Sequence, residues 1–139
     1  MLATGRLLTL AAFVMLAGCG SQPKAAPREV TVWRHVGSWS GHGSTQTESF
    51  VGDTGSLRVD WATSHESSPG AGAFRLTVHS AVSGRAMKVA VDHHGVGRGS
   101  AYVWEEPRMF HISVESANVD WSFAVEEASP GNVAESTRR

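Results

Sequence analysis

Residues 119–125 read Val-Asp-Trp-Ser-Phe-Ala-Val, an alternation of large apolar side chains with small or polar ones. Successive side chains of a β-strand point to opposite faces of its sheet. The stretch therefore predicts a strand that buries one face and exposes the other. The residues expected on the buried face are Val119, Trp121, Phe123 and Val125.

The same period-two pattern recurs at residues 57–61, 74–78, 87–91 and 110–114, with weaker versions at 30–36, 45–50 and 101–104. Turn residues separate these runs, among them glycine, serine and proline over 67–72. Short strands between such turns predict an all-β chain, an antiparallel β-sandwich of about seven or eight strands. The other side chains expected in its core are Leu57, Val59, Trp61, Phe74, Leu76, Val78, Met87, Val89, Val91, Phe110, Ile112 and Val114.

The first residues of the chain have the pattern of an export signal. Arg6 precedes an uninterrupted run of mostly apolar residues over 7–16. A membrane-spanning helix needs about 20 such residues, whereas the apolar part of a cleaved signal is about half as long. Residues 1–18 are therefore predicted to be a signal peptide that is removed on export.

The apolar run ends in Leu16-Ala17-Gly18-Cys19, which resembles the bacterial lipobox. Cys19 is the only cysteine of the chain and has no partner for an internal disulfide. The resemblance implies that Cys19 carries a diacylglyceryl thioether, and that the protein is held on the outer face of the cell membrane or on the outer membrane. Gly20 follows, where an aspartate would signal retention at the inner membrane.

The segments on either side of the predicted domain differ from it in composition. Residues 19–28 are small and polar with two prolines, which is typical of a tether between lipid and domain. The sandwich is expected over residues 29–127, and residues 128–139 are expected to form a flexible tail because their hydrophobic pattern is lost.

Composition limits the partners. The chain has 139 residues with 12 basic and 13 acidic side chains, a formal net charge of -1. One domain of this size with balanced charge lacks the basic surface that nucleic-acid binding needs. The expected partners are the membrane, through the lipid on Cys19, and an envelope protein or polysaccharide.

Six stretches of the predicted domain together carry a family resemblance: Trp39-Ser40-Gly41-His42-Gly43, Thr47-Glu48-Ser49-Phe50, Leu57-Arg58-Val59-Asp60-Trp61, Gly72-Ala73-Phe74-Arg75-Leu76-Thr77-Val78, Phe110-His111-Ile112-Ser113-Val114-Glu115-Ser116 and Trp121-Ser122-Phe123-Ala124-Val125-Glu126. With them the domain resembles small, mostly uncharacterised β-sandwich domains of bacterial lipoproteins and secreted proteins. This resemblance implies the sandwich fold and an exported location, and it transfers no catalytic residue.

No pattern in the chain indicates catalysis, a cofactor or a metal site. The seven histidines form no recognised ligand motif, and the tandem His93-His94 would point to opposite faces of a strand unless it lies in a loop. No serine stands in a G-x-S-x-G elbow. The adjacent Glu105 and Glu106 would diverge, whereas glycoside hydrolysis needs two facing carboxyl groups. We therefore expect a protein that is not an enzyme.

The aromatic residues are the remaining candidates for binding. Tyr102 and Trp104 are in phase, so they share one face, which either points outward or covers the core while Ala101 and Val103 point out. Trp39 lies in a serine- and glycine-rich stretch that predicts a loop. The pattern does not decide whether Trp33 points inward or outward. Trp61 and Trp121 are expected to meet in the core from opposite sheets.

Two functions fit these features. The first is a lipid-anchored, non-catalytic envelope module with a binding or structural role. The alternative is a carbohydrate-binding module of the cell wall that stacks sugars on Tyr102, Trp104 or Trp39. An exposed Tyr102–Trp104 pair with parallel rings favours the alternative, and burial of all tryptophans favours the first.

Overall fold

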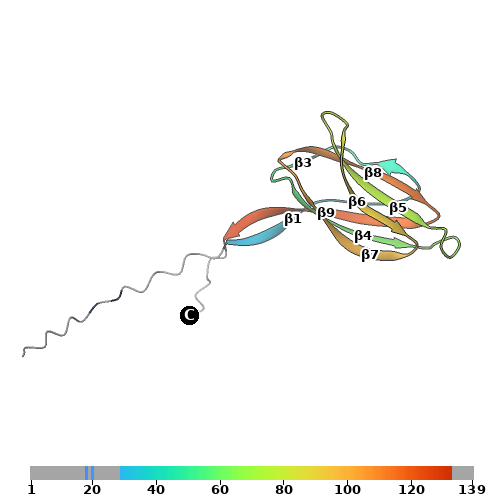
Figure 1. The fold of residues 1–139 in the computed structure, drawn as a ribbon, viewed down its shortest axis with the longest axis horizontal. Coiled ribbons are helices and arrows are strands. Elements are labelled where there is room, and N and C mark those ends of the chain that lie inside the picture. Colours follow the sequence, from blue (N-terminus) through green and yellow to red (C-terminus); the bar gives the residue numbers. More distant parts are fainter. Residues whose placement is uncertain (1–17, 19, 21–28, 133–139) are drawn as a thin grey trace, which may run out of the picture.

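The computed structural model describes residues 18, 20 and 29–132, and this part of the chain contains nine strands and no helix. The strands form two antiparallel sheets packed against each other, which confirms the predicted β-sandwich (Figure 1). Their bounds are β1 (Glu29–His42), β2 (Thr45–Gln46), β3 (Phe50–Gly52), β4 (Ser56–Ser64), β5 (Ala73–Ser80), β6 (Ala86–His94), β7 (Gly97–Trp104), β8 (Arg108–Ala117) and β9 (Asp120–Asn132). The signal peptide, Cys19 and the tether, except Gly18 and Gly20, lie outside the described residues.

The first sheet has the strand order β1-β9-β4-β7, and the second has the order β2-β8-β5-β6 with β3 also paired to β8. The stretch at 119–125 lies almost wholly in β9, which pairs with β1 on one side and with β4 on the other. Its alternating pattern follows from the packing of the two sheets, because each sheet has one face in the core and the other in solvent.

The core lies between the sheets and draws side chains from both. Every strand with a strong alternating pattern contributes to it as expected, with one addition from β7, Val103, and one exception in β6. The buried apolar residues are Leu57, Val59, Phe74, Leu76, Val78, Val91, Val103, Phe110, Ile112, Val114, Val119, Trp121, Phe123 and Val125. Trp61 and Met87 are half-buried and pack against this core.

Val89 is the exception, because 41% of its surface is exposed although its phase predicted burial. The register between β5 and β6 shifts twice, first where Leu76 faces Val91 but Thr77 faces Val89. Such a bulge places an extra residue in one strand and turns the following side chains over. Ala90 and Met87 therefore pack against the core in place of Val89.

The strand expected over 45–50 is divided into β2 and β3, both of which pair with β8. Thr47 lies in the gap and is buried. Its Oγ1 accepts a hydrogen bond from the Ile112 backbone N–H at 3.0 Å, and its own N–H donates to the Ile112 carbonyl at 2.9 Å. The side chain thus takes over a ladder bond where the strand breaks.

β1 and β9 form a long two-stranded ribbon that runs out of one end of the sandwich (Figure 1). β9 continues past the domain boundary expected at residue 127 and reaches Asn132, paired with Glu29. The first part of the expected tail is therefore strand, and residues 133–139 lie outside the described residues. Pro130 fits there because β4 no longer pairs with β9 beyond Glu127, so one missing N–H breaks no bond on that side.

Trp39 lies within β1 and not in a loop. Its ring packs toward the core, 5.3 Å from the ring of Phe123 and 5.9 Å from that of Phe50 between centroids. Gly37 makes room for it, since a Cβ on that residue would lie 2.5 Å from the indole. Gly37 therefore allows the Trp39 ring to pack closely, and Ser38 and Ser40 give β1 small side chains on its outward face.

Trp121 is buried, as its phase predicted, with only 5% of its surface exposed. The aromatic residue that faces it from the other sheet is Phe74 of β5, with nearly parallel rings 6.3 Å apart. Trp61 lies instead on β4, the neighbour of β9 in the same sheet, so the expected contact across the sheets was wrong. The indole N–H of Trp121 donates to the Gly43 carbonyl at 2.8 Å.

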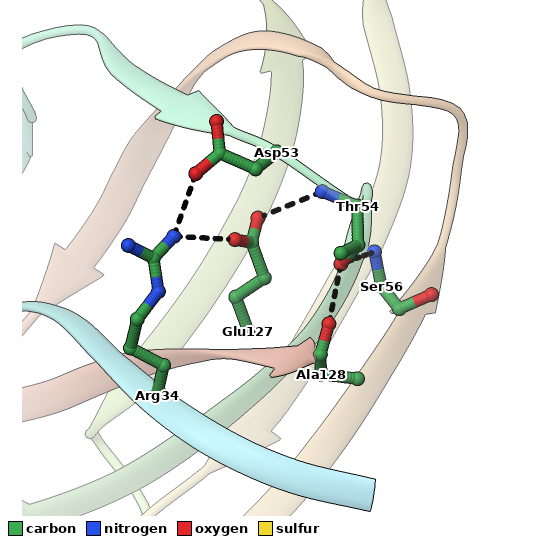
Figure 2. A network of polar contacts seen from close by, with 6 residues as sticks. All are labelled: Arg34, Asp53, Thr54, Ser56, Glu127 and Ala128. Atoms are coloured by element: carbon green, nitrogen blue, oxygen red, sulfur yellow. Dashed lines mark hydrogen bonds and ion pairs between the residues drawn. The ribbon is translucent and has the colours of Figure 1, made fainter. Parts of the chain in front are cut away.

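The buried end of the ribbon contains a carboxylate, Glu127, of which only 1% is exposed (Figure 2). Arg34 of β1 donates to its Oε1 at 2.7 Å and also to Asp53 at 2.8 Å. The Thr54 backbone N–H donates to Oε2 at 3.2 Å, while the Thr54 hydroxyl donates to the Ala128 carbonyl. These bonds join β1, the β3–β4 turn and β9, and the bond to Glu127 is the main cause of a raised Arg34 pKa.

Candidate functional site

An open groove of about 810 Å³ lies on the outer face of the first sheet. Its lining comes from all four strands, because the residues that alternate with the core residues of β1, β9, β4 and β7 all point to this face. We call it the outer groove. The outward residues that line it are Ser38, Ser40, Asp60, Ala62, Arg98, Ser100, Ser122 and Ala124.

The floor of the outer groove consists of small side chains in register. Ser122 of β9 lies between Ser40 of β1 and Ala62 of β4, and Arg98 of β7 follows opposite Ala62. A row of serine and alanine across three strands leaves space above the sheet and provides hydroxyl groups that both donate and accept hydrogen bonds. This arrangement suits an extended polar ligand.

Tyr102 and Trp104 lie on this same face, on the strand that supplies Ser100 and Arg98. They are 44% and 66% exposed, while Val103 between them is fully buried. Their rings are 6.1 Å apart with planes only 7° from parallel. Of the two orientations that the sequence allowed, the outward one is confirmed.

Trp33 joins the pair, although the sequence did not indicate its face. Its ring meets that of Tyr102 edge-on at 5.9 Å, and the guanidinium of Arg58 lies 4.6 Å from its centroid. Trp33 comes from β1 and Tyr102 from β7, at opposite edges of the sheet. We call Trp33, Tyr102 and Trp104 the aromatic rim.

Arg58 stabilises the aromatic rim from below. Its guanidinium donates to Glu126, which raises the Arg58 pKa, and it also lies 3.7 Å from a carboxylate oxygen of Asp60. The hydroxyl of Ser100 donates to the other oxygen of Asp60. These contacts hold Arg58 under the indole of Trp33, where a cation attracts the ring face.

The sheet end opposite the aromatic rim contains Asp120 with two histidines. His42 contacts one carboxylate oxygen through Nδ1 at 2.9 Å, and His65 contacts the other at 3.0 Å. The bond to His42 is the largest cause of a lowered Asp120 pKa. Within the described residues, no three histidine, cysteine, aspartate or glutamate side chains are arranged to hold a metal ion.

Of the three aromatic binding candidates, Trp39 is among the residues that line the outer groove, whereas Tyr102 and Trp104 lie outside its lining on the same face of the sheet. The ring of Trp39 nevertheless packs inward against Phe123, and its N–H donates to Glu48. Tyr102 is two residues beyond the groove-lining Ser100 on β7 and is exposed, as is Trp104. Trp33, Arg58 and the small-residue floor were not singled out from the sequence. The serines at 38, 40, 100 and 122 were visible as the outward phase of predicted strands, but their common location depends on strand order.

Comparisons with protein-family models, with curated proteins and with solved structures find no match for this chain. In the part of the chain that the structure describes, no helix is long and apolar enough to cross a bilayer.

Proposed function

We propose that this protein is a non-catalytic module of the cell envelope, anchored by lipid on Cys19, that binds carbohydrate at the outer groove. The observation that carries the proposal is the exposed Tyr102–Trp104 pair with nearly parallel rings. The flat C–H face of a sugar ring packs on such aromatic faces while its hydroxyl groups bond to polar side chains. The serine-lined floor beside the pair supplies those polar partners.

Burial supports a binding role for Trp104 over a structural one. A tryptophan that is 66% exposed contributes little to the core, and a large aromatic surface in water is what interfaces use as an anchor. Trp33 contacts Tyr102 edge-on and is itself held by Arg58, and none of these three residues belongs to the core. The side chains of the aromatic rim are thus preorganised in the unbound protein.

We expect Trp104→Ala to weaken glycan binding by about tenfold or more, equivalent to about 1.4 kcal/mol, because it removes the most exposed ring of the aromatic rim. The full chain, purified in detergent micelles, is titrated with a panel of soluble cell-wall and plant-wall oligosaccharides, and tryptophan fluorescence and calorimetry report binding. The folded state should keep its stability within about 0.5 kcal/mol.

Met109→Ala is the matched control, since Met109 is a 43% exposed apolar residue on β8 of the other sheet. It should leave binding unchanged. Equal losses in both variants, or no glycan bound by the unaltered chain, would contradict the carbohydrate proposal and leave the anchored module with a protein partner.

The lipid anchor has its own test. If Cys19 is the acylated residue, cells that are fed an alkyne fatty acid should label the unaltered chain, and Cys19→Ala should abolish the label. The same substitution should release the protein from the membrane fraction, because acyl chains contribute about 0.8 kcal/mol per buried methylene. Equal labelling of the two chains would refute the anchor.

A further inference from the structure

We propose that the ligand of the outer groove is a glycan whose sugar rings carry carboxylates, a uronate polymer, and that Arg98 binds the carboxylate. This inference rests on the proposed carbohydrate function and narrows its ligand class. It is carried by Arg98, which lines the outer groove and has no bonded partner among the described residues.

The other charged side chains at the outer groove or next to it already have partners within the protein. Arg58 is paired with Glu126 and lies 3.7 Å from Asp60, and Asp60 also accepts a hydrogen bond from Ser100. Arg98 lines the outer groove and is exposed, yet it makes no hydrogen bond or ion pair with any residue that the structure describes. The donors of the Arg98 guanidinium are therefore not used by any described residue, and they can bind an anionic group of a ligand.

The strand register keeps Arg98 free. Its neighbour across β4 is Ala62, and the next residue in that row is Ser122 of β9, so no carboxylate stands in its row of the sheet. Small residues beside it leave the planar guanidinium open to the outer groove. The acidic residues of this face lie in the neighbouring rows, with their own partners.

Spacing places Arg98 and the aromatic rim within reach of one ligand. Arg98 and Tyr102 are on the same face of β7, four residues apart, a distance of about 13 Å at 3.3 Å per residue. A chain of linked sugars can thus stack one ring on the aromatic rim while another ring presents its carboxylate to Arg98.

The chemistry of the two contacts selects a uronate. A guanidinium forms two parallel hydrogen bonds to a carboxylate, and such charge-assisted bonds are about twice as strong as neutral ones. The aromatic rim requires a ring with an apolar face. A poly(glycerol phosphate) has anionic groups that an arginine would accept, but it has no sugar ring in its backbone to stack, so a uronate polymer satisfies both contacts where this polymer satisfies one.

The experiment compares two probes with the same sugar backbone, one with free carboxylates and one in which methyl esters remove their charge. Oligogalacturonate and its methyl ester are titrated by calorimetry into the full chain in detergent micelles, with Arg98→Gln and Arg75→Gln as variants. Arg75 serves as the control because it is a half-exposed arginine on β5 of the other sheet, where it lies 3.9 Å from Glu115 and away from the outer groove. The unaltered chain should bind the acid roughly tenfold more tightly than the ester, and Arg98→Gln should remove that preference. Arg75→Gln should keep it.

The outcomes separate this inference from the proposed function. Equal affinity for acid and ester, or an equal loss in Arg75→Gln, overturns the assignment of Arg98, while a Trp104-dependent affinity for the ester keeps the carbohydrate proposal. Binding of poly(glycerol phosphate) more tightly than the acid also overturns the choice of a uronate. If Arg98→Gln does not fold, Arg98→Lys replaces it. Lysine keeps the positive charge but cannot form the two parallel hydrogen bonds of a guanidinium to a carboxylate. The acid should then bind more weakly than it does to the unaltered chain, and the affinity for the ester should not change.

Discussion

Trp121→Ala should destabilise the protein by about 3–5 kcal/mol, the range for truncating a buried large aromatic residue. The indole is 5% exposed, packs against Phe74 across the sandwich and against Phe123 along its own strand, and donates to the Gly43 carbonyl. The substitution removes these contacts and leaves a cavity. That loss is a large share of the roughly 5–15 kcal/mol that holds a domain together. Urea titration of the full chain, followed by fluorescence and circular dichroism, measures it.

Substitutions of two other tryptophans provide comparisons for the loss of stability expected in Trp121→Ala. Trp104→Ala should change the free energy of unfolding by less than about 0.5 kcal/mol, because its side chain is mostly in water. Trp39→Ala should fall between the two, since its ring is half-buried against Phe123 and Phe50. A Trp121→Ala protein as stable as Trp104→Ala would show that the core is not where the structure places it.

Removing the carboxylate of Glu127 should have the second large effect. Glu127→Ala is expected to cost about 2 kcal/mol, because it leaves the Thr54 N–H without its acceptor and separates β9 from Arg34. Arg34→Ala should lower the melting temperature further than Glu127→Gln does, since it leaves a buried charge without its ion pair. In the double variant Arg34→Ala/Glu127→Gln, part of the loss should be recovered. Thermal unfolding of the four proteins tests the order.

Asp53→Ala is the control for that series. Asp53 also pairs with Arg34, at 2.8 Å, but both side chains of this pair are more than half exposed. Exposed ion pairs contribute little because water screens them. A loss in Asp53→Ala as large as that in Arg34→Ala would mean that the surface pair, and not the buried carboxylate, holds the ribbon to the β3–β4 turn.

The face that each strand turns to the core is local information. Side chains alternate along a strand whatever its partners are, so the order of apolar and polar residues is enough to predict that Phe74, Ile112 and Trp121 point inward. The same logic left Tyr102 and Trp104 on one face, and only the burial of Val103 decided which face that is.

Glu127 illustrates where this logic stops. It continues the inward phase of Val119, Trp121, Phe123 and Val125. From the sequence alone, however, an acidic residue at the end of an apolar run is predicted to be exposed to solvent. Its burial depends on Arg34, which is 93 residues away in the chain. Val89 is the converse case, because an irregular pairing with β5 turned it to the surface.

The sequence by itself determined the all-β class and the inward phase of most strong strands, because each depends on residues that are near one another in the chain. The export signal stays a prediction from the sequence. Tertiary structure decided the order of strands in each sheet, the bulges, and with them the outer groove. Ser40, Ala62, Arg98 and Ser122 share one row only because β1, β9, β4 and β7 pair in that order. Strand pairing is set by contacts between distant segments, and an alternating pattern has the same form for many possible neighbours.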